Sequence, residues 1–234
     1  MTEGDPWEQI LAAMRGRHDL TPPWICQVCT RLVPVTGAAI VETIEVNRRH
    51  LVCATDDVAA QLETLQFSLG EGPGVYAVRT GTSVQVSDLH QAGHLQWPIF
   101  AEAASHTTAR ALYCIPLRIE TISVGVLTLY RDQPGLLTDP ELTSAQLCAH
   151  VAFWMLLASR VDPRADPPPP QPTDPNHTPA AIQQATRMVM TQLAISADAA
   201  LATLRAYAYA HAQPLDQVAG HIISGRLRFP LDNQ

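Results

Sequence analysis

The sequence predicts an α+β fold in two parts, in which a sheet flanked by helices is followed by a small bundle of three helices. Strand-like and helix-like segments alternate between residues 20 and 160. Three short amphipathic segments follow residue 180, with apolar residues spaced three or four apart. At 234 residues the chain is long enough for one full-sized domain and one small domain.

Apolar patterning predicts the individual elements of the first part. Helices are expected over residues 21–33, 56–66 and 139–159. Strands are expected over residues 37–45, 50–55, 83–86, 110–119 and 123–130. The connection between the last two strands is too short for a crossover helix, so the sheet is predicted to be antiparallel or mixed.

Repeated prolines between residues 161 and 175 separate the two parts. Proline lacks a backbone N–H and fixes φ, so no helix is expected to continue through this segment. The segment is predicted to be an extended or semi-rigid spacer. The expected organisation is an amino-terminal extension over 1–18, a first domain over 19–160, a linker over 161–179 and a helical bundle over 180–229.

The bundle is predicted from apolar stripes and helix-start residues. Ile182, Ala185 and Val189 fall on one face of the first helix. Ser196 is placed to cap the second helix, and Pro214 to begin the third. A unit of this size is too small to be an enzyme domain.

Residues 182–227, IQQATRMVMTQLAISADAALATLRAYAYAHAQPLDQVAGHIISGRL, resemble an ANTAR domain, the three-helix RNA-binding module of bacterial antitermination regulators. The most specific part is ISADAALATLRAYA followed by PLDQVA. The resemblance implies binding to tandem RNA hairpins in leader transcripts, near a terminator, so that transcription continues when a signal is present. The sequence departs from the family pattern at several positions, which weakens the expected RNA contact: Thr186, Arg187, Ala199, Ala206, Tyr209, Gln213 and Asp216.

Five side chains of this segment are candidates for RNA contact. Arg187 and Arg205 could reach phosphates or bases. Gln183 and Gln184 could hydrogen-bond base edges, and Tyr209 could stack on an unpaired base. Each also has a structural alternative: a salt bridge, a solvated helix position or a packing group. Residues 1–179 carry a net charge of −8 and residues 180–234 a net charge of +1, so only the bundle can approach a phosphate backbone without strong repulsion.

The first part resembles the GAF domain of actinobacterial GAF-ANTAR proteins, from about Asp19 to Ser159. The resemblance is carried by LGEGPGVYAVRTGTSVQVSDL, WPIFAEAA and ALYCIPLRIETISVGVLTLYRDQPGLLTDPEL. It implies a sensory domain with a central antiparallel sheet, helices that can mediate dimerisation, and a pocket for a small molecule. Members that bind cyclic nucleotides carry an Asn-Lys…Phe…Asp-Glu signature, which the sequence lacks, so the signal is an unknown small molecule or protein.

Three aromatic residues are candidates to line that pocket, namely Trp97, Phe100 and Tyr113, although aromatic core anchors are more common than ligand cages. The glycines between Leu69 and Gly74 are not predicted to bind phosphate. That segment follows a helix, lacks a Gly-Lys-Ser/Thr ending and contains an acidic residue.

The five cysteines are expected to be reduced thiols, because their number is odd and the chain is too large to need disulfides. Cys26 and Cys29 form a C-x-x-C pair, which is either half of a redox or metal site or two buried apolar side chains. His90 and His94 are four residues apart but belong to a segment expected to be a surface loop. No metal site and no cofactor is predicted.

No catalytic motif is found, so no catalytic residue is predicted. The sequence shows neither a signal sequence nor an expected membrane span, which predicts a cytoplasmic protein. The apolar faces of the 139–159 helix and of the bundle predict a homodimer. Two alternatives remain open: a dimerisation or protein-interaction regulator with a degenerate ANTAR domain, and a haem or metal sensor of gas or redox state.

Overall fold

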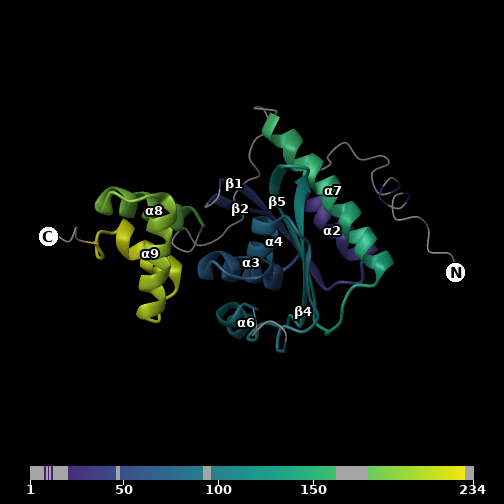
Figure 1. Ribbon diagram of the computed structural model, residues 1–234, viewed down its shortest axis with the longest axis horizontal. Helices are drawn as coiled ribbons and strands as arrows, with labels where there is room; N and C mark the ends of the chain where they lie inside the picture. The colour runs from purple at the N-terminus through teal and green to yellow at the C-terminus, as the bar shows by residue number, and fades with distance from the viewer. Residues whose placement is uncertain are drawn as a thin grey trace. The chain divides into compact units, whose positions relative to one another are not determined.

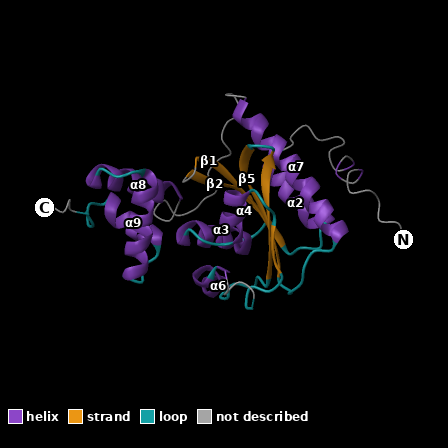
Figure 2. Ribbon diagram, viewed as in Figure 1, coloured by secondary structure: helices purple, strands orange, loops and turns teal. Residues whose placement is uncertain are grey.

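The computed structural model describes residues 8, 10, 12, 21–45, 48–91, 96–161 and 179–229. The chain divides into two compact units. One contains a sheet with helices on both faces, and the other contains three helices (Figure 1; Figure 2). The predicted α+β class is therefore confirmed.

Five strands form the sheet in the order β2-β1-β5-β4-β3. The strands are β1 Gly37–Glu45, β2 Arg48–Ala54, β3 Val84–Val86, β4 Ala111–Ile119 and β5 Ile122–Arg131. β1 pairs with β5, β5 with β4, and β4 with β3, in each case antiparallel. Because β5 is the central strand and both its faces are covered, every side chain from Val124 to Tyr130 is buried.

Helices cover both faces of the sheet. α2 (Pro22–Leu32) and α7 (Asp139–Val161) pack together on one face, and α3 (Asp57–Leu69), α4 (Pro73–Thr80) and α6 (Pro98–Ala104) lie on the other (Figure 1). Side chains alternate along β4, so Tyr113 belongs to the core beneath α2 and α7, whereas Leu112 and Cys114 belong to the core beneath α3, α4 and α6.

The helices and strands predicted for this unit are all present, with ends that differ by at most three residues. Two short helices, α4 and α6, were not predicted. Each begins with a proline, Pro73 or Pro98, at a position where the missing N–H has no partner within the helix. Asp56 caps α3, with its Oδ1 accepting the N–H of Ala59 at 2.8 Å.

α7 differs from the sequence expectation on membrane spans. Among the described residues it is the one helix long and apolar enough to cross a membrane. The prediction that no such stretch exists is therefore wrong by length and composition. Part of its apolar character is explained by packing on the sheet, where six residues join the core: Ala145, Cys148, Ala149, Ala152, Phe153 and Leu156.

The cysteines also differ from expectation. Cys26 on α2 and Cys53 on β2 form a disulfide, so the prediction of five reduced thiols is wrong. The two residues are 27 positions apart, and the packing of α2 on the sheet brings them together. Cys29, Cys114 and Cys148 are free thiols and are buried.

Three helices form the second unit: α8 Pro179–Leu193, α9 Ala197–Ala210 and α10 Leu215–Ile223. α8 packs against both of the others. Ser196 caps α9 as predicted, its hydroxyl oxygen accepting the N–H of Ala199 at 3.3 Å. Pro214 precedes the first helical residue of α10. The small core is formed by apolar residues of all three helices: Ile182, Ala185, Val189, Leu201, Leu204, Ala208, Leu215, Val218, Ala219 and Ile222.

Candidate functional site

The three aromatic side chains predicted to line a sensory pocket lie on opposite faces of the sheet. Trp97 and Phe100 are buried in the core beneath α3, α4 and α6. Tyr113 is buried in the core beneath α2 and α7. Because the sheet lies between them, the structure does not bring the three together.

Trp97 and Tyr113 have packing or hydrogen-bond partners of their own. The indole of Trp97 meets the ring of Tyr76 edge-on, with 6.0 Å between centroids. The hydroxyl of Tyr113 donates a 2.7 Å hydrogen bond to the carbonyl of Gly135, and burial raises the pKa of that hydroxyl. In this structure Trp97 and Tyr113 are core anchors, which is the alternative to lining a ligand pocket.

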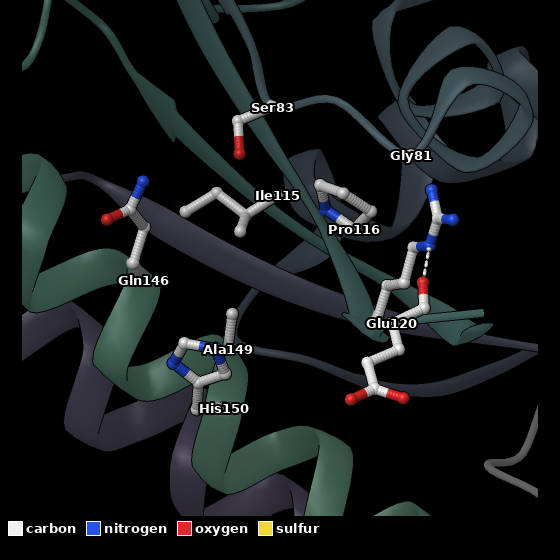
Figure 3. Close-up of a pocket in the computed structure, with 9 residues that line it drawn as sticks. Gly81, Ser83, Ile115, Pro116, Glu120, Gln146, Ala149 and His150 are labelled. Carbon is white, nitrogen blue, oxygen red and sulfur yellow. Dashed lines mark hydrogen bonds between the residues drawn. The ribbon is translucent and has the colours of Figure 1, made fainter. Parts of the chain in front are cut away.

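A hollow of about 400 Å³ lies elsewhere, at the sheet edge between β4 and α7 (Figure 3). β3 pairs only with Leu112–Cys114 of β4, so the later part of β4 is not covered by that strand. Pro116 stands in this part, in keeping with the preference of proline for strand segments that lack a neighbour on one side. The lining mixes apolar and polar residues: Gly81, Ser83, Ile115, Pro116, Arg118, Glu120, Gln146, Ala149 and His150.

Arg118 brings a positive charge to this hollow, but its guanidinium is already engaged. Its Nε donates a hydrogen bond to the carbonyl of Glu120 (Figure 3). A Cβ added at Gly81 would lie 1.8 Å from Nη1 of Arg118, so the glycine lets the guanidinium rest against the end of α4. The carboxyl end of a helix carries partial negative charge, which favours that placement. None of the lining residues was predicted, because they come from separate elements and form no motif.

The structure offers no metal site in the residues that it describes. No group of three or more His, Cys, Asp or Glu side chains there could hold an ion. Cys26 of the C-x-x-C pair is bonded to Cys53. His90 lies in a turn, and His94 lies outside the described residues.

The residues predicted to contact RNA form one group on each of two helices. On α8, Gln184 and Arg187 are exposed and lie one turn apart, and Gln183 beside them is half-buried. On α9, Arg205 is half-buried and Tyr209, one turn later, is 74% exposed. Burial lowers the pKa of Arg205 to about 10, which leaves the guanidinium charged at neutral pH.

The departures from the family pattern fall in different environments. Thr186 is buried, and its hydroxyl donates a 2.7 Å hydrogen bond to the carbonyl of Ile182, so it belongs to the packed face of α8. Ala199 and Ala206 are exposed on α9. Their methyl side chains can neither carry charge nor form hydrogen bonds, so these two departures change the surface that the bundle presents.

Sequence reasoning missed an aromatic cluster formed by Tyr207, His211 and Phe229. The rings of Tyr207 and His211 stack with 3.9 Å between centroids, and Phe229 meets Tyr207 edge-on at 5.5 Å. The backbone N–H of Phe229 donates to Oε1 of Gln192 at 3.1 Å, which holds the end of the described chain against α8. The i, i+4 spacing of the first two residues is a signal for the stacked pair, whereas the contact with Phe229 has no signal in local spacing.

Two exposed arginines, Arg226 and Arg228, lie in the segment that leads to this cluster. Together with Arg187 and Arg205 they give residues 179–229 four arginines against two aspartates, Asp198 and Asp216. The bundle is thus weakly basic, and its aromatic and cationic side chains are the types that bind nucleic acid.

These features define a class of protein in which an α+β domain precedes a small helical module. A family model described as GAF domain matches residues 25–153, and one described as ANTAR domain matches residues 177–223. The chain therefore belongs to the GAF family and is a GAF-ANTAR regulator, as the sequence resemblance implied.

Solved structures show the same fold for the first domain. The GAF domain from a phosphoenolpyruvate-protein phosphotransferase of Coxiella burnetii has a TM-score of 0.50 and 11% identity, covering 66% of this chain and 92% of that chain. The corresponding GAF domain from Acinetobacter has a TM-score of 0.52 and 11% identity, covering 69% and 95%. At this identity the likeness concerns the fold alone. No curated protein matches the chain.

Proposed function

We propose that the protein is a cytoplasmic regulator of transcription antitermination, in which a GAF domain over 19–160 receives a signal and an ANTAR domain over 180–229 binds tandem RNA hairpins in leader transcripts. The observation that carries this proposal is the exposure of Arg187 and Tyr209 on a folded bundle that matches the ANTAR family. Both matched families are regulatory, and no catalytic step is proposed.

The chemistry of the bundle sets the expected mode of binding. Arg187 is exposed and can neutralise a phosphate, and Tyr209 offers an accessible ring on which an unpaired base can stack. With four arginines against two aspartates, long-range attraction is small, so stacking and hydrogen bonding must supply much of the affinity.

A homodimer would supply further RNA affinity by presenting two bundles to two hairpins at once. Linking two weak contacts raises overall affinity when the spacing of the partners permits both contacts. α7 carries the largest side chain that would favour such a dimer, because Trp154 is 58% exposed.

The proposal is tested with full-length protein and two RNAs of equal length, one with tandem hairpins and one scrambled to remove them. We expect tighter binding to the hairpin RNA and only a modest loss of affinity with salt, because few phosphates are neutralised. Arg187→Ala should weaken binding and reduce the slope of log affinity against log salt by about one unit. Arg79→Ala removes an exposed arginine from α4 instead, and should leave both quantities unchanged.

A second function is favoured by the exposed alanines at 199 and 206, two of the positions at which the sequence departs from the family pattern. In that case the bundle is a protein-interaction module with no RNA ligand. Equal binding of the two RNAs at low salt, with the dimer intact, would replace the first proposal with this one.

A further inference from the structure

Four of the five cysteines lie in the core formed by α2, α7 and the sheet. Cys26 on α2 is bonded to Cys53 on β2. Cys29 follows one turn later on α2 and lies in the same core as Cys148 on α7, whose thiol raises the pKa of Cys29. All four are at most 2% exposed. The sulfur atoms thus connect three elements in the order β2, α2 and α7.

We propose that this core is a thiol–disulfide exchange site, in which a single disulfide occupies either the position between β2 and α2 or the position between α2 and α7. The proposal does not depend on RNA binding. The exchange would transfer the disulfide onto α7, the helix that directly precedes the proline-rich segment.

The exchange takes place in two balanced steps. In the first, the thiolate of Cys29 attacks Sγ of Cys26, a bond forms between these two sulfurs, and Cys53 leaves as a thiolate. In the second, the thiolate of Cys148 attacks Sγ of Cys29, and Cys26 leaves. Each leaving thiolate takes up the proton that the attacking thiol lost. One disulfide and two thiols are present throughout, so no oxidant or reductant is consumed.

The surroundings of the sulfurs support each step. Residues three apart on a helix lie on the same side, at about 5–6 Å between Cβ atoms, so a bond between Cys26 and Cys29 needs a local adjustment of α2. Sγ of Cys53 lies 3.3 Å from the carbonyl oxygen of Pro22, which can accept a hydrogen bond from the released thiol. Cys148 lies in the same core as Cys29, where α7 packs against α2.

Packing controls the rate of the exchange. The contact with Cys148 and burial raise the pKa of Cys29, so the attacking thiolate is scarce while α2 and α7 are closed. Any signal that loosens α2 against α7 therefore accelerates the exchange. In a reducing compartment, disulfides that persist in mesophilic proteins usually have a catalytic or redox-sensing role.

The test maps the disulfides of full-length protein purified without reductant. Samples are held at pH 7 and pH 9, with and without a low concentration of urea, then acid-quenched, alkylated and digested with trypsin. The tryptic peptide 18–31 contains both Cys26 and Cys29, whereas Cys53 lies in 50–79 and Cys148 in 132–160. We expect the linked pair 18–31/50–79 to decrease and 18–31/132–160 to appear, about tenfold faster for each unit of pH.

Three variants separate the steps. Cys29→Ala should retain only the link between Cys26 and Cys53, and Cys148→Ala should stop at the link between Cys26 and Cys29. Cys114→Ala is the matched control, because Cys114 is a buried free thiol on the opposite face of the sheet, and it should exchange like the wild type. Should Cys29→Ala fail to fold, Cys148→Ala still tests the second step.

Three results would overturn the proposal. The first is wild-type protein in which all five cysteines are alkylated before any reduction. The second is a link between Cys26 and Cys53 that persists unchanged at pH 9 in urea. The third is exchange onto Cys148 in the Cys29→Ala variant, which would show that Cys29 is not the intermediate attacking group.

Discussion

The backbone N–H of Gly74 donates a 2.6 Å hydrogen bond to Oε1 of Gln66, a side chain with no exposed surface. The amide nitrogen of Gln66 in turn donates to Oε1 of Glu63 at 2.9 Å. A Cβ added at Gly72 would lie 2.8 Å from the Gln66 side chain, and one at Gly74 would lie 2.9 Å from it. The glycines of this turn therefore leave room for the buried Gln66 amide, which joins α3 to α4. This packing role is the structural alternative to phosphate binding.

Replacing Gln66 with alanine should destabilise the GAF domain by about 2–4 kcal/mol, because the change leaves the N–H of Gly74 buried without its acceptor and creates a cavity. The matched control is Gln61→Ala, an exposed glutamine on the same helix, which should change stability by less than about 0.5 kcal/mol. All four tryptophans precede residue 160, so tryptophan fluorescence in urea reports on this domain. Equal midpoints for the two variants would contradict the role assigned to Gln66.

Acid should weaken the GAF domain through Asp88. The hydrogen bond from Arg110, at 3.0 Å, lowers the pKa of Asp88, and the N–H of His90 also donates to this carboxylate. A lowered pKa in the folded state means that the stabilisation is present above the unfolded pKa, near 4, and is lost as pH falls through the folded pKa. Because the side chain of Arg110 is 34% exposed, solvent screening limits the contribution to about 1 kcal/mol.

Asp88→Asn should therefore be less stable than the wild type by about 1 kcal/mol at pH 7, with the difference shrinking toward zero below about pH 3. Urea unfolding at pH 7, 5 and 3 measures this. Glu102→Gln, at an exposed position on α6, provides the control. Its stability should differ little from that of the wild type, without the pH dependence expected for Asp88→Asn. A difference for Asp88→Asn that is constant with pH would show that the carboxylate charge is not responsible.

Regular elements could be predicted because their signals are local. The largely apolar sequence of β5 reflects a central strand, and the hydroxyl of Ser196 marks the start of α9. α4 was missed because it begins within the glycine-containing turn that accommodates Gln66. The helix-start signal of Pro73 was available, but the glycines around it favoured a loop.

The parts that could not be predicted depend on contacts between distant segments. Cys26 and Cys53 are brought together only when α2 packs on the sheet, and no local pattern encodes that distance. Odd positions such as Tyr113 face one core and even positions the other, so the register of β4 was needed to separate Tyr113 from Trp97. The RNA candidates on α8 and α9 were chosen by side-chain chemistry within the segment that resembles an ANTAR domain, and their binding of RNA stays a prediction.

Trp154 should contribute to a homodimer. Its side chain is 58% exposed on α7 and meets Phe153 edge-on, with 5.3 Å between centroids. Burying an indole against a second copy would remove a large apolar surface from water, so Trp154→Ala should weaken the dimer by about tenfold or more. Light scattering across a concentration series measures the change. Leu136→Ala serves as the control, because Leu136 is also 58% exposed but lies outside α7. A wild type that is monomeric at micromolar concentration would contradict the prediction.

Tyr209 gives the sharpest test of the RNA surface, because its exposure separates binding from stability. At 74% exposed it contributes little to the bundle core, so Tyr209→Ala should leave the helical content and unfolding of the bundle nearly unchanged. If a base stacks on this ring, the same variant should lose about 1–3 kcal/mol of RNA affinity, which is roughly a fivefold to 150-fold rise in Kd.

Tyr76→Ala is the matched control for that loss, since Tyr76 is an exposed tyrosine on α4 of the GAF domain. It should bind hairpin RNA like the wild type. A stacking contact is largely independent of salt, so the loss for Tyr209→Ala should be similar at low and high salt, whereas the loss for Arg187→Ala should diminish as salt increases. Wild-type affinity in Tyr209→Ala, with the bundle folded, would remove Tyr209 from the RNA surface and transfer the stacking role to other aromatic side chains of the bundle.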